Sequence, residues 1–396
     1  GGPLARTGKP MSKTYDIAVV GATGVVGESM LQILSERKFP VGKVYALASE
    51  RSVGKTVEFG NRELIVEDLA GFDFSRVQIG LFSAGGSISE EFAPKAADAG
   101  CVVIDNTSHF RYEDDIPLVV PEVNPEAIAD YTSRGIIANP NCSTIQMVVA
   151  LKPIYDAVGI ERINVCTYQA VSGAGRSAVE ELVRQTTLLL NGRPLEIDGD
   201  AKQIAFNAIP HIDVFLDNRY TKEEMKMVWE TRKILGDDDI LVNPTAVRIP
   251  AFFGHSEAVH IETRDKISAA AVSELLANCP GIEVLDGVET GEYPTAVTES
   301  SGADPVFVGA FVISRWDAGE GLQSRPRGLS RRHRRAYGSE GDVVVAPMGR
   351  ACRLGGRVRT RACGNAMRRG VVAQLPAACR ISASHPRLEW GGGCLG

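Results

Sequence analysis

The hydrophobic pattern in the first third of the chain alternates between short apolar runs and amphipathic stretches. The run YDIAVV predicts a buried strand, GATGVVG a glycine turn, and ESMLQILSER a helix with Met30, Leu31 and Leu34 on one side. Further strands are predicted at VYALAS, QIGLFSA, CVVIDNTS and GIIANP, with the helix SEEFAPKAADAG between two of them. Such alternation is typical of α/β domains, in which helices cover both faces of a parallel sheet. We therefore predict such a domain over residues 11–140.

Beyond Pro140 the helices gather apart from a run of strands. Helices are predicted from Ser143 to about Val158 and over AVEELVRQTTLLL, EEMKMVWETRKIL and ISAAAVSELLANC. Strands are predicted at INVCTYQAV, TAVRIP, SEAVHIET and PVFVGAFVIS. This segregation favours an α+β domain with a mostly antiparallel sheet over residues 141–315. At the boundary a strand end meets a helix start, and open α/β sheets bind ligands at such carboxyl ends.

The two ends of the chain differ in composition from the rest. Residues 1–10 precede Met11 and show no periodicity, so we interpret them as a non-native extension. Residues 310–396 contain 16 Arg, no Lys and five acidic residues, although the whole chain has a net charge of −6. Arginine, glycine, alanine and proline without lysine are what GC-rich DNA yields when it is read out of frame. We expect residues 316–396 to form an atypical Arg-rich tail, disordered or out of frame, with an RNA-binding arm as the alternative.

Composition also excludes several classes of protein. Hydrophobic residues make up 44% of the chain, and no apolar run approaches the roughly 20 residues that a membrane helix needs. Residues 1–20 lack the apolar core of a signal peptide, and the cysteines form no CxxC pair before residue 300. The sequence therefore predicts a cytoplasmic protein of two domains without a metal site or membrane contact. The acidic charge of the chain before the tail disfavours a nucleic-acid partner.

The glycine turn and the end of the second predicted strand suggest a dinucleotide site. Gly21, Gly24 and Gly27 stand where missing side chains let a pyrophosphate approach the backbone and a helix N-terminus, although a plain βα turn is the alternative. Arg51 and the serines beside it suit a 2′-phosphate, which favours NADP, whereas Glu50 would suit NAD. The expected cofactor-binding residues are Gly21, Ala22, Thr23, Gly24, Val25, Val26, Gly27, Ser49, Arg51, Ser52, Ser83, Ala84, Gly85, Ser172 and Gly173.

Cys142 carries the sharpest chemical signal. In NPNCSTIQMVVAL it follows a strand and a proline and lies in the first turn of a predicted helix, whose dipole stabilises a thiolate. Cys101 and Cys166, in contrast, lie inside apolar strands, where a cysteine usually packs as a small core residue. A cysteine beside a dinucleotide site suggests hydride transfer through a thioester. His255, in a glycine-flanked loop, is a candidate proton carrier, but catalytic and structural roles stay equally open for it from the residues alone.

Six motifs, in this order, resemble the aspartate-semialdehyde dehydrogenase family over residues 13–309: GATGVVG, DNTSHFR, NPNCST, QAVSGAG, EEMK and RIPAFFGHSEAVHIET. The resemblance implies a Rossmann-type NADP-binding domain, a catalytic and dimerisation domain, and a homodimer. It implies an enzyme that interconverts β-aspartyl phosphate and aspartate semialdehyde, with inorganic phosphate as the other product or substrate, in lysine, threonine and methionine biosynthesis.

The resemblance also implies roles for individual side chains. Arginine can grip a carboxylate in bidentate fashion, and a glutamate and a lysine two apart on a helix diverge toward opposite ends of a small substrate. The implied roles are nucleophile for Cys142, acid/base catalyst for His255, holding of the reacting group for Gln169, substrate carboxylate for Arg248, substrate amine for Glu224, and phosphate for Arg111, Asn141 and Lys226.

Two rival functions stay open. N-acetyl-γ-glutamyl-phosphate reductase shares the fold and the cysteine, but an acylated amine has no charge for Glu224 to balance. The other rival is a non-catalytic NADP-binding protein.

Overall fold

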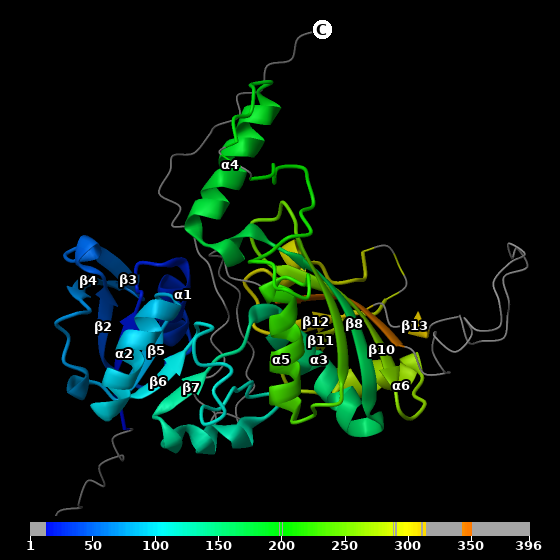
Figure 1. The fold of residues 1–396 in the computed structure, drawn as a ribbon, viewed down its shortest axis with the longest axis horizontal. Coiled ribbons are helices and arrows are strands. Elements are labelled where there is room, and N and C mark those ends of the chain that lie inside the picture. Colours follow the sequence, from blue (N-terminus) through cyan, green and yellow to red (C-terminus); the bar gives the residue numbers. More distant parts are fainter. Residues whose placement is uncertain are drawn as a thin grey trace, which may run out of the picture.

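The computed structural model describes residues 13–309 except 198, 200, 288 and 290, together with the strand segments 312–313 and 343–350. Two seven-stranded sheets lie side by side, and one helix projects away from both (Figure 1). In the described part of the chain, no helix has the length and apolar character needed to cross a membrane.

The first sheet has the strand order β3-β4-β2-β1-β5-β6-β7. Its pairs are parallel apart from the hairpin of β3 and β4. Its strands are β1 (Tyr15–Val20), β2 (Val41–Ala48), β3 (Thr56–Phe59), β4 (Arg62–Asp68), β5 (Ile79–Phe82), β6 (Val102–Asp105) and β7 (Ile136–Ala138). This sheet confirms the predicted parallel α/β domain, and only the hairpin adds to the prediction.

Alternate residues of β1 show why both faces of this sheet are covered. Ile17 and Val19 pack in the cluster that contains the apolar face of α1 (Val25–Glu36). Ala18 and Val20 point the other way, into the cluster that contains α2 (Gly86–Asp98). A strand buried on both faces reads as a continuous apolar run, as YDIAVV does.

The second sheet has the order β11-β12-β14-β10-β8-β9, with β13 beside β14. Its strands are β8 (Ile160–Gln169), β9 (Leu241–Arg248), β10 (His255–Thr263), β11 (Ile282–Val284), β12 (Val306–Val308), β13 (Val312–Ile313) and β14 (Val343–Arg350). The prediction of a mostly antiparallel sheet was wrong, because β8 and β9 pair in parallel, as do β11 and β12. A long crossover containing α4 (Arg176–Leu190) and α5 (Lys222–Leu235) separates β8 from β9, and such a connection returns the chain in the same direction. The sheet is therefore mixed.

One strand from the region after residue 315 joins this sheet. β14 pairs antiparallel with β10 and β12. The other residues of the predicted tail, and residues 1–10, lie outside the described residues, so the interpretation of both ends stays a prediction.

The helix α3 (Cys142–Val158) connects the two sheets. Met147 and Leu151 of α3 belong to a hydrophobic cluster that also holds Val20 of the first sheet, Val165 of the second and Val272 of α6 (Ala269–Ala277). This shared core fixes the start of α3 at the junction of the sheets.

Candidate active site

The glycine turn has the close packing that a dinucleotide site requires. Gly21 has a φ of +86°, and a Cβ on it would lie 3.0 Å from the backbone of Ala84. A Cβ on Gly27 would lie 2.2 Å from the carbonyl oxygen of Gly21. Gly24 is the N-cap of α1, and a glycine has no side chain with which to cap the helix. The first turn of α1 thus presents bare backbone N–H groups, with the Ser83–Gly85 loop beside it, and these residues fit a bound pyrophosphate.

The loop after β2 lies at the end of the strand next to β1. Ser49 is the N-cap of a short 3-10 helix, Glu50–Ser52, Arg51 lies within that helix, and both residues are exposed. The guanidinium of Arg51 is therefore accessible to an anion at the outer end of a dinucleotide.

Cys142 lies in the first turn of a helix, as predicted, and α3 begins at Cys142, one residue before the predicted start at Ser143, with Asn141 as its cap. The amide oxygen Oδ1 of Asn141 accepts from the backbone N–H groups of Ser143 (3.0 Å) and Thr144 (3.3 Å). Burial and the carboxylate of Glu223 raise the pKa of the Cys142 thiol to about 11, although Arg248 and Arg111 act in the opposite direction. Deprotonation of the thiol must therefore accompany its reaction.

One buried carboxylate of the site belongs to Glu223, which was not among the predicted site residues. It is 6% exposed, and it accepts from Asn141 Nδ2 (3.0 Å), Gln169 Nε2 (3.1 Å) and Lys226 Nζ (2.9 Å). Burial raises the pKa of Glu223, but Lys226 and the hydrogen bonds outweigh it and hold the pKa below its ordinary value. Glu223 is thus a charged acceptor next to Cys142.

Glu224, which was expected to meet the substrate amine, has both of its carboxylate oxygens bonded within the protein. Glu224 closes a capping box at the start of α5, with its backbone N–H donating to Thr221 Oγ1 (3.2 Å) and its Oε2 accepting from the Thr221 N–H (2.7 Å). Its other oxygen accepts from the Ala246 N–H (3.0 Å). The capping pattern, threonine with glutamate three residues later, was present in the sequence and would have separated the two glutamates.

Lys226 lies three residues after Glu223 on the same side of α5, and the two side chains form an ion pair. The divergence expected from the sequence concerned Glu224 and Lys226. Its Nζ contacts Asp213 (2.8 Å) as well as Glu223 (2.9 Å). Two carboxylates therefore offset its charge, which weakens it as an isolated phosphate ligand.

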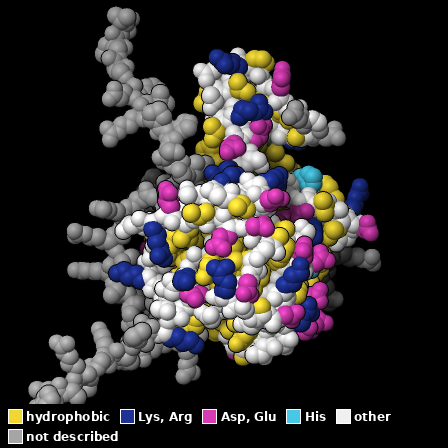
Figure 2. Space-filling view, turned by 90° about the vertical axis from the view of Figure 1, so that its left-hand side faces the viewer, with side chains coloured by type: hydrophobic (Ala, Val, Ile, Leu, Met, Phe, Trp, Pro, Cys, Tyr) yellow, Lys and Arg dark blue, Asp and Glu magenta, His cyan; other side chains and the backbone are white. Residues whose placement is uncertain are grey.

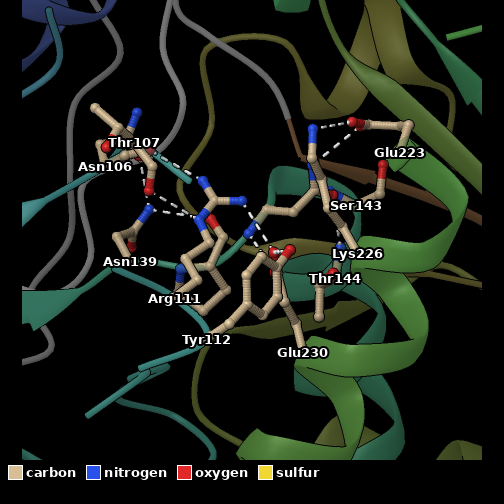
Figure 3. Close-up of polar contacts among 12 residues, drawn as sticks. Asn106, Thr107, Arg111, Tyr112, Asn139, Ser143, Thr144, Glu223, Lys226 and Glu230 are labelled. Carbon is tan, nitrogen blue, oxygen red and sulfur yellow. Dashed lines mark hydrogen bonds and ion pairs between the residues drawn. The ribbon is translucent and has the colours of Figure 1, made fainter. Parts of the chain in front are cut away.

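Arg111 lies in the loop that follows β6 in the first domain, and its side chain faces α5 (Figure 3). Its Nε donates to the Thr107 carbonyl and its Nη2 to the Asn106 carbonyl, both at 3.0 Å. Its Nη1 forms an ion pair with Glu230 at 3.0 Å. Arg111 was a predicted site residue and Glu230 was not, because a glutamate in a highly charged helix is typical of a solvent-exposed face.

The second sheet brings three predicted residues into one row. Gln169 at the end of β8 is in register with Arg248 of β9 on one side and His255 of β10 on the other. Gln169 Nε2 also donates to Ser143 Oγ (2.7 Å), beside Cys142. A Cβ on Gly173 would lie 3.2 Å from Arg248 Nη1 and 3.4 Å from His255 Nε2, so both groups face the same space.

His255 is buried and neutral. Burial and the nearby Arg248 lower its pKa to about 4. The Ala170 N–H donates to Nδ1 at 3.1 Å, so the neutral ring carries its proton on Nε2. In this state the imidazole offers a hydrogen-bond donor to the site.

Comparisons with known proteins match this architecture. The model of the semialdehyde dehydrogenase NAD-binding domain matches residues 16–131, and that of the semialdehyde dehydrogenase dimerisation domain matches residues 151–316. The aspartate-semialdehyde dehydrogenase of Legionella pneumophila is 63% identical over 299 residues, 76% of this chain and 86% of that protein. A crystal structure of aspartate semialdehyde dehydrogenase II from Vibrio cholerae is 54% identical, with a TM-score of 0.77 and coverage of 85% of this chain and 93% of that chain. Another structure of the Vibrio protein, complexed with ASA, is 53% identical with a TM-score of 0.77, over 86% of this chain and 93% of that chain.

Proposed function

The chain belongs to the aspartate-semialdehyde dehydrogenase family, and from this premise we propose that its site interconverts β-aspartyl phosphate and aspartate semialdehyde through a thioester on Cys142. The chain is thus an oxidoreductase with an NAD(P)-binding domain. The observation that carries the proposal is the convergence of the Arg248–Gln169–His255 row with Cys142, which is linked to the row through the Gln169–Ser143 hydrogen bond.

Charge complementarity supports this substrate. Arg248 is partly buried, and its Nη1 is occupied by the Ala170 carbonyl at 2.7 Å, which leaves other guanidinium N–H groups for the substrate carboxylate. Glu223 takes the place that Glu224 was expected to fill and faces the substrate ammonium. Arg111 and Asn141, which are linked through Glu230, form the phosphate side of the site, and Lys226 contributes less because Asp213 and Glu223 offset its charge.

In the biosynthetic direction, Cys142 Sγ bonds to the acyl carbon of β-aspartyl phosphate while the carbon–oxygen bond to phosphate breaks. When bound, the nicotinamide cofactor supplies a hydride to the thioester carbon, and the carbon–sulfur bond then breaks to release the aldehyde. Three N–H groups at the start of α3 already have acceptors, so the N–H of Cys142 itself is the backbone donor for the substrate oxygen. Such a donor is worth about 3 kcal/mol in acyl transfer.

His255 donates from Nε2 to the same oxygen. To accept the thiol proton at Nε2, the ring must first carry its own proton on Nδ1, which breaks the hydrogen bond from the Ala170 N–H. The hydrogen bond between the Ala170 N–H and His255 Nδ1 is therefore broken and formed again once in each catalytic cycle.

We assign NADP as the cofactor because Arg51, Ser49 and Ser52 suit a 2′-phosphate at the end of β2. Arg51→Ala is expected to reduce the preference for NADP over NAD.

The homodimer is assigned to the face of the second sheet opposite α3 and α5. Tyr168 of β8 and Leu241 of β9 are 39% and 45% exposed there. The helix α4 projects from the rest of the molecule (Figures 1 and 2), and its Leu190 is 74% exposed. Exposed apolar area of this kind marks an interaction surface, and the matched domain is a dimerisation domain.

The decisive experiment mixes the protein with aspartate semialdehyde, NADP and inorganic phosphate and follows NADPH absorbance. Phosphate-dependent NADPH formation is expected. The same assay with N-acetyl-glutamate semialdehyde tests the rival reductase, which the charge of Glu223 disfavours. No turnover with either aldehyde would contradict the proposal.

A further inference from the structure

Glu230 is a second buried carboxylate on α5, and the proposed reaction leaves it without a role. Its side chain is 0% exposed. Oε1 accepts from Arg111 Nη1 (3.0 Å) and from the Tyr112 hydroxyl (3.3 Å), and Oε2 accepts from the Asn141 N–H (2.6 Å). One carboxylate thus contacts both the phosphate-side arginine and the cap of the Cys142 helix (Figure 3).

The contact with Arg111 fixes both the charge and the direction of the guanidinium. Burial lowers the pKa of Arg111, but Glu230 outweighs it and holds the pKa above its ordinary value. Three of the N–H groups of Arg111 donate to Glu230, Thr107 and Asn106. A guanidinium has five N–H donors, so two are left to meet a ligand.

The contact with Asn141 determines which donors the start of α3 offers. Oδ1 of Asn141 accepts two N–H groups of the first turn, and Glu230 accepts that of Asn141 itself. Within the described residues, the N–H of Cys142 is the one of these four donors without a protein acceptor.

The same helix holds the Arg111 loop at a further point. Lys233 lies three residues after Glu230, and its Nζ donates to the carbonyl oxygens of Arg111 (3.0 Å) and Ile116 (3.0 Å). Two residues of α5 therefore hold the Arg111 loop: Glu230 contacts the side chain of Arg111, and Lys233 contacts the backbone of the loop.

We propose that Glu230 is a positioning residue that fixes Arg111 relative to the first turn of the Cys142 helix, so that phosphate is held beside the acyl carbon on Cys142. This inference rests on the proposed function. A carboxylate is required because it alone accepts hydrogen bonds on both oxygens at once.

The test is Glu230→Gln in the phosphate-dependent assay. The amide replaces one acceptor by a donor, which then faces an N–H of Arg111 or Asn141. We expect the KM for phosphate to rise about tenfold or more, with the KM for NADP unchanged within about twofold. Glu113→Gln, which removes an exposed carboxylate from the same loop, is the matched control and leaves both constants unchanged within about twofold.

A double-mutant cycle with Arg111→Leu separates this inference from the proposed function. Arg111→Leu alone tests the phosphate site, and adding Glu230→Gln to it should change the phosphate KM by less than about twofold. If Arg111→Leu raises this constant and Glu230→Gln does not, the positioning role is overturned. An additive effect of the two substitutions overturns it as well.

Removal of a buried charge can prevent folding, and thermal unfolding shows whether it does. In that case Lys233→Met replaces Glu230→Gln, because it releases the same loop without leaving Arg111 unpaired. A rise of about threefold in the phosphate KM supports the role of α5 in positioning Arg111, and an unchanged constant contradicts it.

Discussion

Two helices begin at the site directly after a strand, and their N-termini are capped in different ways. The first turn of α1 follows Gly24, and no side chain caps it. The first turn of α3 is closed by Asn141, and Glu230 accepts a further N–H. The helix left open suits a diphosphate, which needs several donors, whereas the closed helix reserves one donor for one substrate oxygen. Cap residues thus distinguish two uses of the same backbone feature.

The two helices also differ in the charge near their first turns. Glu28 of α1 is paired with Arg176 of α4 at 2.8 Å, so its carboxylate does not oppose an anion there. At α3, Glu223 and Glu230 stay inside the site and are offset by Lys226 and Arg111. At α1 the charge of Glu28 is thus offset by an arginine where a diphosphate is expected. At α3 two carboxylates remain in the site, where an ammonium group and a phosphate group are expected to bind at different positions.

The largest effect is expected at α3. Cys142→Ser should lower semialdehyde oxidation by about three orders of magnitude or more, because it removes the nucleophile of a covalent mechanism. NADP binding, measured by fluorescence titration, should stay within about twofold, since the glycine turn lies at α1. Retention of a tenth of the wild-type rate would refute the role of Cys142.

A smaller effect is expected at α1. Gly27→Ala places a Cβ 2.2 Å from the Gly21 carbonyl oxygen, so the turn must shift and the affinity for NADP should fall about 100-fold, or roughly 3 kcal/mol. Gly71→Ala is the control, because its nearest contact is Asp68 Oδ2 at 3.9 Å. Equal NADP affinity in both variants would mean that the turn does not bind the cofactor.

The open and the closed helix also differ in how far the sequence predicts them. The strand, glycine turn and helix at α1 were predicted from local pattern, because Gly24 and Gly27 both face the carbonyl oxygen of Gly21 within the turn itself. At α3 the position of Cys142 was predicted, but Glu230 was not, since its partner Arg111 lies 119 residues away in the sequence. The hairpin β3–β4 was missed because only Val57, Phe59 and Val66 are buried among its charged residues.

The pH dependence of stability tests the burial of His255. Its pKa is about 4 in the folded protein, against about 6.5 when unfolded. The unfolded state therefore binds more protons between these values, and stability is complete above pH 6.5 and falls as the pH drops toward 4. The loss between pH 7 and pH 5 should be about 2 kcal/mol. Denaturant midpoints of His255→Asn should fall less over this range than those of the wild type, and parallel curves would place the histidine in solvent.

The smallest effect is expected at a third helix start, that of α5, where two adjacent glutamates make different contacts. Glu224→Ala removes the capping box of α5 and should lower the free energy of unfolding by about 1 kcal/mol, with kcat/KM unchanged within about twofold. Glu223→Gln should do the reverse and lower kcat/KM for aspartate semialdehyde, because a neutral amide cannot pair with the substrate ammonium. Steady-state kinetics and denaturant unfolding of both variants distinguish the two roles. A large kinetic loss in Glu224→Ala, with Glu223→Gln active, would return the substrate contact to Glu224 and show that the cap pattern does not separate these residues.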